Sequence, residues 1–256
     1  MISIVTPVLN GVKFIEKNID SIQKLSIPFE HIIVDGGSSD GTLEIIRKYS
    51  HVKVLHQLDK MGMYSAIHQG FLAAKYECIT WINCDDMIMK DNFEKAVLMF
   101  QNKNIDFLYG GVLYHNINNK NLIYRPTIHY TKCLLNSGIM AVAQSSTLYK
   151  KKLYFKCQGL NYQKFKLLGD LDLFQRFARQ ENVKFLSFNK PISIFYLYDG
   201  SLLASNTDRY NIEKKFIGKK PNFLKLVLYK LMLTPYYLNK ILINKYLFKF
   251  KSKDFE

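Results

Sequence analysis

Short apolar segments alternate with stretches of helical periodicity over the first hundred residues of the chain. The apolar segments, rich in β-branched residues, predict strands over Ile2–Thr6, His31–Asp35, Val52–His56 and Cys78–Asn83. Helices are expected around the apolar stripe of Ile15, Ile19 and Ile22 and over residues 41–49 and 63–75. Strands that alternate with helices are typical of βαβ units, so we expect an α/β fold with a mostly parallel central sheet and flanking helices.

The pattern changes after residue 106. The segments Leu108–His115 and Leu122–Arg125 flank the polar, turn-forming cluster Asn116–Asn121, which predicts a β-hairpin. Further along, a helix is expected over residues 170–180 and a strand over residues 183–188.

Residues 214–256 form a basic tail. They hold eleven Lys against Asp254 and Glu256, so the tail carries nine of the fifteen excess positive charges of the chain. Apolar and aromatic residues recur between the lysines, and Pro235 divides the tail into two predicted helices. We expect this amphipathic tail to lie on an anionic membrane surface. The alternative is that its apolar face packs on the preceding domain or on a second subunit.

Composition limits the class of protein. With 256 residues, 48% of them hydrophobic, the chain suits one large domain with an appendage and is neither disordered nor collagen-like. The four cysteines lack metal-site or disulfide-framework spacing, which favours a reducing compartment. The first residues lack the pattern of a secretory signal, and no uncharged apolar run reaches the roughly 18 residues of a membrane span. We therefore expect a cytoplasmic protein, peripheral on the inner face of the cytoplasmic membrane.

The net charge of +15 brings nucleic acid, a phosphorylated metabolite and a membrane surface into consideration as partners. The excess charge lies mainly in the tail, and the sequence contains no recognisable nucleic-acid-binding module. We therefore expect no nucleic-acid partner and keep a basic nucleic-acid-binding protein as an alternative function.

Polar motifs follow the predicted strands at their carboxyl ends, where ligands of open α/β sheets bind. The three most distinctive motifs are Thr6-Pro7-Val8-Leu9-Asn10, Val34–Thr42 and Asn83-Cys84-Asp85-Asp86. Asp35 puts a carboxylate on a rigid strand end, before a Gly-Gly-Ser-Ser loop whose backbone can approach a planar ligand. The alternative is an ordinary turn with a helix cap at Asp40 or Thr42.

Asp85 and Asp86 directly follow the apolar run that ends the fourth predicted strand. Burial of that run would bring two adjacent carboxylates to the mouth of the sheet. Hard oxygen ligands on one short turn suit Mg²⁺ or Mn²⁺ held jointly with a diphosphate. The alternative is a pair of solvated loop residues or helix caps.

The order and spacing of the three motifs resemble the family 2 glycosyltransferases of the GT-A fold, especially the small bacterial enzymes that build O-antigen and capsule polysaccharide. The resemblance covers about residues 1–205. It implies a GT-A catalytic domain over residues 1–213, with a nucleotide-sugar-binding half over 1–106 and an acceptor half over 107–213. It also implies an inverting hexosyl- or N-acetylhexosaminyltransferase that uses Mn²⁺ or Mg²⁺ to transfer a sugar from a UDP-sugar to a lipid-linked or saccharide acceptor.

The resemblance also assigns roles to single residues. Asp35 matches the family Asp that accepts the N3–H of a uracil ring. Asn83 stands in place of the first Asp of the family's D-x-D element, which leaves open whether Asp85 or Asp86 is the direct metal ligand. The other donor contacts implied by the match are Thr6, Pro7, Asp59, Lys60, Gly200 and Ser201.

Two stretches depart from the family pattern. After Asp59, Ser65 replaces the usual acidic residue and His68 replaces the common Asn, and we expect His68 on the surface of its helix. Before Gln144, Ala143 replaces the usual His.

The segment Leu168–Arg176 resembles the family's acidic motif at the start of a helix, with Asp170 matching the catalytic base. Capping is the alternative role for Asp170, because an Asp at a helix N-terminus is a common cap and the helix dipole there lowers its pKa. Asp172 is expected to cap the helix or to pair with Arg176 one turn later.

A metal-dependent nucleotidyltransferase of similar layout is the alternative enzyme, because it too uses an acidic metal site. Such enzymes normally need a Gly-rich basic loop for a triphosphate, whereas residues 7–11 offer one Gly, with Lys13 as the nearest basic residue. The sequence gives no indication of the oligomeric state.

Overall fold

The computed structural model describes residues 1–128, 130–198 and 207–218. Over these residues the chain forms nine strands: β1 (Ile2–Val8), β2 (Phe29–Asp35), β3 (Val52–His56), β4 (Cys78–Trp81), β5 (Met87–Ile88), β6 (Phe107–Asn116), β7 (Leu122–Arg125), β8 (Thr147–Lys150) and β9 (Phe185–Leu197). The same residues form eight α-helices: α1 (Ile15–Gln23), α2 (Thr42–Ile46), α3 (Met63–Ala73), α4 (Lys90–Asn102), α5 (Thr131–Asn136), α6 (Lys151–Lys156), α7 (Gly169–Ala178) and α8 (Thr207–Phe216). A short 3₁₀-helix spans Gln144–Ser146.

All nine strands join one sheet, in the order β3-β2-β1-β4-β8-β6-β9-β5, with β7 paired to β6. The first four in this order run parallel. Their register places Val8 beside Asp35 and Asp35 beside His56, so the carboxyl ends of β1, β2 and β3 meet at one edge. The remaining strands pair in both directions, with β6 and β9 parallel and β8 and β5 antiparallel to their neighbours.

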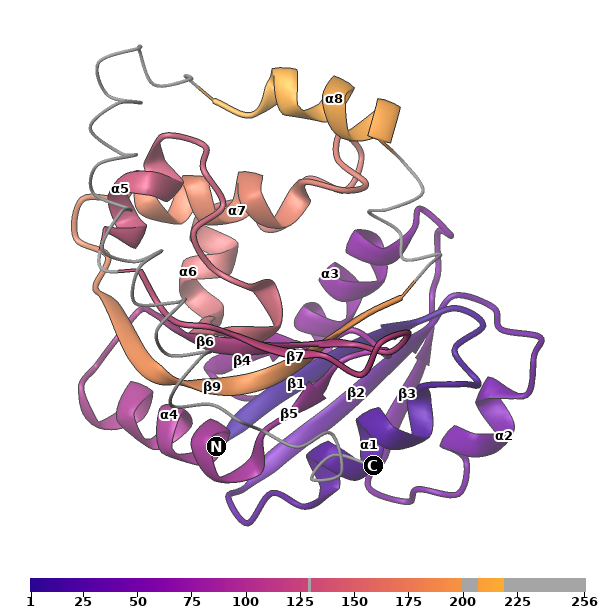
Figure 1. Cartoon of the computed structure of the whole chain (residues 1–256). Coiled ribbons are helices and arrows are strands. Elements are labelled where there is room, and N and C mark those ends of the chain that lie inside the picture. The colour runs from indigo at the N-terminus through magenta and orange to yellow at the C-terminus, as the bar shows by residue number, and fades with distance from the viewer. Residues whose placement is uncertain (129, 199–206, 219–256) are drawn as a thin grey trace.

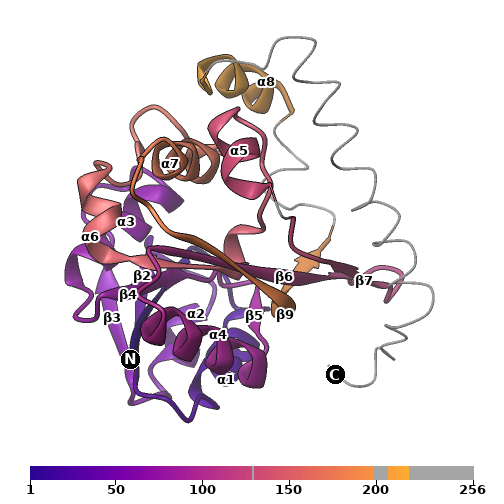
Figure 2. The same cartoon turned by 90° about the vertical axis from the view of Figure 1, so that its left-hand side faces the viewer.

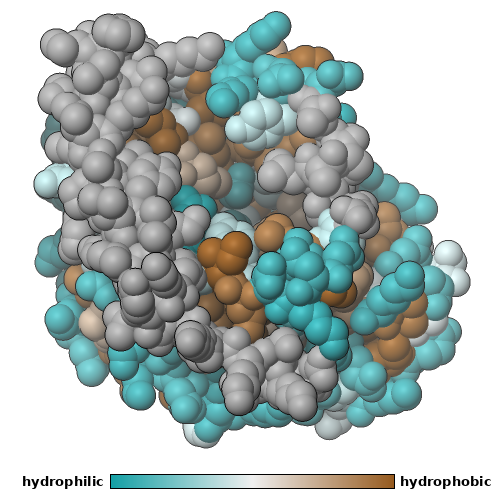
Figure 3. Space-filling model, in the orientation of Figure 1, coloured by the Kyte–Doolittle hydropathy of each residue, from teal (hydrophilic) through white to brown (hydrophobic). Residues whose placement is uncertain are grey.

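Helices cover both faces of the sheet. Figures 1 and 2 show α1, α2 and α4 on one face and α3, α5, α6 and α7 on the other, with α8 outermost above α7. In the space-filling view, a hollow lies between these upper helices and the sheet, and hydrophilic and hydrophobic residues meet there (Figure 3). The layered arrangement leaves the loops at the carboxyl ends of the strands free to form a site.

The main core is aromatic and lies between the sheet and α3, α6 and α7. Its largest fully buried side chains include Phe71, Trp81, Phe107, Tyr149 and Phe174. The ring of Phe174 stacks on Trp81 at 6.2 Å and meets Phe107 edge-on at 5.2 Å. Each such side chain stabilises the fold by about 1.5–3 kcal/mol through burial alone, so α7 is firmly attached to the sheet.

The strands and helices expected in the first hundred residues are present, with shifted ends. Strand β1 continues to Val8, so Pro7 lies inside the strand, which was expected to end at Thr6. Helix α2 is shorter than expected and ends at Ile46. The hairpin is also present: β6 and β7 pair antiparallel, with His115 opposite Leu122.

Strand β9 is much longer than the segment expected over residues 183–188. It runs beside β6 with register shifts around Gly110 and Gly111. A Cβ on Gly110 would lie 2.7 Å from Cγ1 of Ile192, so this close approach of the two strands requires glycine.

Helix α8 crosses the boundary expected at residue 213. Ile217, one residue after the helix, is buried in the main core. The rest of the basic tail, from residue 219, lies outside the described residues. Among the residues that the structure does describe, none belongs to a helix long and apolar enough to cross a bilayer.

Candidate active site

Asp35 ends β2 and is buried at the edge where the parallel strands meet. Its carboxylate accepts hydrogen bonds from the backbone N–H groups of Gly37 (3.0 Å) and Ser38 (3.2 Å). The imidazole Nδ1 of His56, on β3, lies 3.9 Å from Oδ2 of Asp35. The loop after β2 thus wraps around the carboxylate and holds it in one orientation.

The loops after β1 and β2 are joined to each other. The backbone N–H of Asn10 donates to the Ser38 hydroxyl at 2.9 Å, and that of Ser39 donates to the Asn10 side chain at 3.0 Å. Asp40 accepts the N–H of Thr42 at 3.1 Å, and it also accepts the N–H of Val12. Asp40 therefore ties the loop after β1 to the start of α2.

Thr6 and Pro7 are buried within β1. The Thr6 hydroxyl lies 2.9 Å from Nε2 of His31. Burial, with a smaller effect from His51, lowers the pKa of His31 to about 3, so its ring is neutral at pH 7. In this structure the Thr6 side chain contributes to the packing beneath the site.

Asp59 precedes α3 and is bound to the first turn of that helix. Both of its carboxylate oxygens accept the Ser65 hydroxyl at 2.6 Å, and the Met61 N–H donates at 3.0 Å. These hydrogen bonds, chiefly that of Ser65, lower the pKa of Asp59. Ser65, in place of the family's acidic residue, therefore orients Asp59, while the neighbouring Lys60 is exposed, with a left-handed φ of 50°.

The acidic turn, residues 83–86, follows β4 and is held from below by Asn18 of α1. The Asn18 amide donates to the backbone carbonyls of Asn83 (3.0 Å) and Asp86 (2.8 Å). Asn18 is buried on the same face of α1 as Ile15, Ile19 and Ile22. An Asn inside an apolar stripe is the sequence signal of this contact, and the motif analysis missed it.

The two carboxylates of the acidic turn have different surroundings. Asp85 is half-buried and accepts the Tyr198 hydroxyl at 2.9 Å, and burial raises its pKa. Asp86 is 1% exposed, and burial together with the charge of Asp85 raises its pKa well above the usual range, an effect partly offset by the backbone N–H of Tyr196. Two ionised carboxylates at this position therefore need a positive partner.

The donor atoms of the acidic turn fit a divalent cation. The side-chain oxygen of Asn83 and both carboxylate oxygens of Asp86 are buried and, within the described residues, have no partner at normal hydrogen-bond distance. Hard oxygen atoms of this kind are the ligands that Mg²⁺ and Mn²⁺ prefer. No cluster of three or more His, Cys, Asp or Glu side chains occurs in the described parts of the chain, so a cation here would need further ligands, such as phosphate oxygens.

Asp170 lies in the first turn of α7. Its Oδ1 accepts the backbone N–H of Leu171 at 2.8 Å and the Tyr64 hydroxyl at 3.3 Å. Tyr64 belongs to the first turn of α3, next to Ser65, so hydrogen bonds connect Asp170 with the loop of Asp59. A Cβ on Gly169 would lie 2.6 Å from the Tyr64 ring, and this close packing keeps the phenol beside Asp170.

The pKa of Asp170 differs from the expectation drawn from the helix dipole. The dipole favours the ionised form, but burial outweighs it and raises the pKa to about 6. The alternative that Asp172 pairs with Arg176 is confirmed by a 2.7 Å contact between Oδ2 and Nη2. Asp170 itself accepts one backbone N–H of the first turn of α7, that of Leu171, while Leu168 occupies the N-cap position.

His68 is not on the helix surface as expected. Its Nδ1 lies 2.8 Å from the Tyr154 hydroxyl, and its ring contacts Tyr154, Phe155 and Tyr162. Burial lowers its pKa. His68 packs into an aromatic cluster because α6 covers this part of α3, an arrangement that the helical periodicity of residues 63–75 cannot reveal.

Three residues of the predicted motifs remain: Gln144, Gly200 and Ser201. Gln144 donates to the backbone carbonyl of Trp81 at 2.6 Å, next to the acidic turn. Gly200 and Ser201 lie outside the described residues. Tyr198, just before them, bonds Asp85 and packs on Phe14 with ring centroids 5.1 Å apart.

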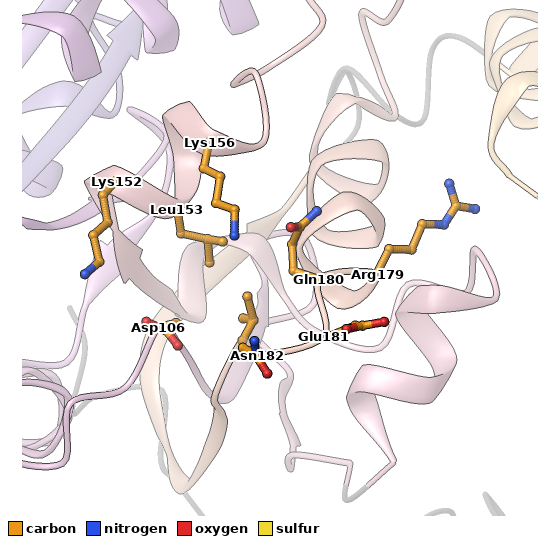
Figure 4. A pocket seen from close by; sticks show the side chains of 9 residues that line it. Asp106, Lys152, Leu153, Lys156, Arg179, Gln180, Glu181 and Asn182 are labelled. Carbon is orange, nitrogen blue, oxygen red and sulfur yellow. The ribbon is translucent and has the colours of Figure 1, made fainter.

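Of two cavities in the described part of the chain, one is lined by predicted site residues and the other is not. The larger, of about 610 Å³, lies beside α6 and α7 and is lined by charged side chains that include Lys152, Lys156 and Arg179 (Figure 4). It contains none of the predicted site residues. The smaller, of about 280 Å³, is lined by Asp85 and Asp86 together with basic and aromatic side chains: Lys13, Phe14, Lys17, Lys120 and Tyr196.

The chain resembles known glycosyltransferases in sequence. Glycosyltransferase GlyG of Streptococcus pneumoniae is 30% identical over 132 residues, which are 50% of this chain and 44% of GlyG. An uncharacterized glycosyltransferase of Rickettsia typhi is 26% identical over 193 residues, or 72% of this chain and 61% of the relative. The putative teichuronic acid biosynthesis glycosyltransferase TuaG of Bacillus subtilis is 28% identical over 116 residues, or 43% of this chain and 46% of TuaG. The chain spans about half the length of the relatives it matches.

Two solved structures show the same fold. TarS 1-349 of S. aureus, in complex with UDP-GlcNAc, superposes with a TM-score of 0.64 at 18% identity, over 82% of this chain and 64% of that one. The mannosyltransferase PcManGT of Pyrobaculum calidifontis, in complex with GDP-Man and Mn²⁺, gives a TM-score of 0.62 at 12% identity, over 99% of this chain and 77% of that one. The expected GT-A fold is thereby confirmed.

The model of glycosyl transferase family 2 matches residues 3–168. The matched segment holds Asp35, Asp59 and the acidic turn, and it ends two residues before Asp170. Because the match covers more than half of the chain and includes the three motifs that first suggested the resemblance, the chain belongs to glycosyl transferase family 2.

Proposed function

We propose that the protein is an inverting glycosyltransferase that transfers a hexose or N-acetylhexosamine from a UDP-sugar to a lipid-linked or saccharide acceptor of a bacterial surface polysaccharide. The observation that carries the proposal is Asp170, a carboxylate held in place by Tyr64 and Leu171 with a pKa of about 6. A base with this pKa is ionised at pH 7 and accepts a proton more readily than an ordinary Asp.

In the proposed reaction Asp170 accepts the proton of the acceptor hydroxyl as its oxygen attacks the anomeric carbon. Both described hydrogen bonds engage Oδ1 of Asp170, so we assign the proton to Oδ2. The bond between the anomeric carbon and the diphosphate oxygen breaks on the opposite face, through an oxocarbenium-like transition state. A single displacement inverts the anomeric configuration.

Asp35, Thr6, Pro7, Asp59 and Lys60 are the proposed contacts of the nucleotide. The Asp35 carboxylate, held by two backbone N–H groups, suits the N3–H of a uracil ring. TarS binds UDP-GlcNAc whereas PcManGT binds GDP-Man, so the family fold serves more than one base and the choice of UDP rests on Asp35. Gly200 and Ser201 complete the proposed donor contacts.

Asp85, Asp86 and Asn83 are the residues that would hold Mn²⁺ or Mg²⁺. When bound, the cation would neutralise charge on the leaving diphosphate. Lys13 and Lys17, which line the cavity beside the acidic turn, add positive charge near the same phosphate groups. Tyr198 orients Asp85 through its hydroxyl.

We place the protein on the inner face of the cytoplasmic membrane, through the basic tail. Eleven lysines with interleaved apolar and aromatic residues support this position, which suits an acceptor carried on a lipid. Membership of glycosyl transferase family 2 favours this function over a nucleotidyltransferase or a nucleic-acid-binding protein.

Two measurements test the proposal. In a thermal-shift screen of UDP, GDP, CDP and dTDP with and without Mn²⁺, we expect UDP with Mn²⁺ to stabilise the chain most, because a ligand that binds only the folded state raises its melting temperature. In a transfer assay, NMR of the product should show the anomeric configuration opposite to that of the donor. Retention of configuration, or stabilisation by GDP and not by UDP, would contradict the proposal.

A further inference from the structure

A buried glutamate of α8 holds the segment that leads into the helix of Asp170. Glu213 is 3% exposed. Its carboxylate accepts the backbone N–H groups of Lys166 (2.8 Å), Leu167 (2.9 Å) and Leu168 (2.9 Å), which immediately precede α7. The side chain of Arg209, one turn earlier on α8, donates to the same carboxylate at 3.0 Å.

The segment bound by Glu213 is also bound to α3. The Leu167 carbonyl accepts the Tyr64 hydroxyl at 2.9 Å, and the same hydroxyl lies 3.3 Å from Oδ1 of Asp170. The Lys166 ammonium donates to the Met61 carbonyl at 2.6 Å, just before α3 begins. At residues 166–168, therefore, α8, α3 and α7 meet, directly before Gly169 and two residues before Asp170.

Helix α8 is anchored at this segment. Its face toward α7 carries Glu213, and Ile217 just beyond the helix is buried in the main core. Its outer face carries Ile212 and Phe216, each 55% exposed. The contrast shows that α8 packs on the molecule through one face and that Glu213 is the polar contact of that face.

We propose that Glu213 is a positioning residue for Asp170: its carboxylate fixes the three backbone N–H groups before α7 and places a negative charge on the segment that leads to the base. The inference rests on the proposed role of Asp170 as the base. Glu213 lies outside the segment matched by the family model, which ends at residue 168.

The directions in which the pKa values of Glu213 and Asp170 are shifted agree with this geometry. Burial alone would raise the pKa of Glu213, but the three backbone N–H groups outweigh burial and the pKa lies below its usual range, so Glu213 is charged at pH 7. Its charge adds to the effect of burial in raising the pKa of Asp170. The other titratable groups that interact with Asp170 are tyrosines with raised pKa values, Tyr64 of α3 and Tyr149 of β8, and both are neutral at pH 7.

Two variants separate the two effects. Glu213→Gln keeps the size of the side chain and one acceptor oxygen but removes the charge, whereas Glu213→Ala removes the whole contact. Ile212→Ala is the matched control, because it changes the neighbouring residue on the exposed face of the same helix. All variants are made in the full chain.

For Glu213→Gln we expect the acid limb of the kcat profile to move to lower pH, because loss of the negative charge lowers the pKa of Asp170. For Glu213→Ala we expect kcat to fall roughly 10- to 100-fold with a smaller change in the donor KM, because a small displacement of a base is costly while Asp35 and the acidic turn lie on other elements. Hydrogen exchange at the amides of residues 166–168 should also accelerate. Ile212→Ala should change none of these quantities.

The carboxyl ¹³C titration of Asp170 by NMR gives a readout that needs no turnover. A lower titration midpoint in Glu213→Gln than in the wild-type chain supports the inference even if Glu213→Ala fails to fold. An unchanged midpoint in Glu213→Gln, or a loss of kcat in Ile212→Ala equal to that in Glu213→Ala, would overturn it. If the wild-type chain transfers no sugar while the midpoint still shifts, the proposed function fails and the electrostatic link between Glu213 and Asp170 stands.

Discussion

At the scale of single residues, burial and hydrogen-bond donors together decide the chemistry of the carboxylates. Donors, chiefly the Ser65 hydroxyl, lower the pKa of the exposed Asp59, whereas burial raises the pKa of Asp170 and of Asp86. One type of side chain can therefore bind a base, orient a loop, accept a proton or hold a cation, according to its surroundings.

The first prediction concerns Asp170. Asp170→Asn should lower turnover by about two to four orders of magnitude, the usual range for loss of a general base, and leave donor binding intact. Because the ionised form is the base and its pKa is about 6, wild-type kcat should fall as the pH drops below about 6. Steady-state kinetics over pH 5–8, with nucleotide binding measured separately, check both statements. Near-normal transfer by the Asn variant would instead move the role of base away from Asp170.

The second prediction concerns the acidic turn. Asp85→Ala and Asp86→Ala should each abolish transfer, and removal of the direct ligand should also weaken metal-dependent UDP binding. Asp86→Asn should in addition raise the free energy of unfolding in EDTA by about 1–3 kcal/mol. The folded-state pKa of Asp86 is raised above its unfolded value, so its ionised form destabilises the fold at neutral pH, and a neutral amide removes that penalty.

Denaturant unfolding with and without Mn²⁺ separates the two effects of Asp86. Mn²⁺ should stabilise the wild-type chain and have little effect on Asp86→Asn if Asp86 is the ligand. Full activity of both Ala variants in excess EDTA would refute the metal assignment.

At the scale of secondary structure, α1 supports the acidic turn and α3 links the turn of Asp59 to Asp170. Asn18 of α1 binds two backbone carbonyls of the acidic turn, and Tyr64 of α3 binds both Leu167 and Asp170. Each helix therefore carries a buried polar side chain that orients a neighbouring segment of the candidate site. Such contacts explain how loops of this kind keep a defined shape on a rigid sheet.

The third prediction tests Asn18. Asn18→Leu keeps the approximate volume but leaves two buried carbonyls without their donor, so the free energy of unfolding should fall by about 1–3 kcal/mol. The concentration of Mn²⁺ needed for half-maximal activity should rise, because the turn loses its orientation. Glu16→Gln, an exposed change on the same helix, is the control. An unaltered metal requirement in Asn18→Leu would show that the turn keeps its shape without this contact.

At the scale of the whole molecule, positive charge is concentrated where the described domain ends. The tail expected to contact a membrane begins within α8, and Glu213 of this helix and Ile217 just after it are buried against the rest of the described chain. Since Ile217 packs in the main core, we expect the membrane contact to lie beyond Gly218.

The fourth prediction concerns this tail. The full chain should float with anionic vesicles at low salt and less so at moderate salt, since each Lys near anionic lipid contributes about 1 kcal/mol. Replacement of Lys219, Lys220, Lys225 and Lys230 by Gln should weaken flotation without changing transfer to a soluble acceptor. A chain ending at Gly218, which keeps Glu213 and Ile217, should not float. Failure of the full chain to float would favour packing of the tail on the protein.

Local sequence pattern is enough to predict the parallel half of the sheet and the places where polar motifs follow its strands. Apolar periodicity is a local property, so it predicted β1 to β4 and the helices between them, and the order of the motifs at Asp35 and Asp85 indicated the family. Since parallel strands end at a common edge, those motifs had to lie near one another in any such fold.

The way in which the second half of the chain packs around the candidate site follows from contacts between distant segments. The parallel pairing of β6 with β9 and the docking of α8 on the segment before α7 join residues far apart in the chain, and local periodicity contains no information about them. The pKa of Asp170 likewise depends on burial beneath Tyr64 and on the charge of Glu213, two groups 106 and 43 residues away in sequence. Its position at a helix N-terminus alone predicted the opposite shift, because desolvation is a property of the assembled fold and not of the segment.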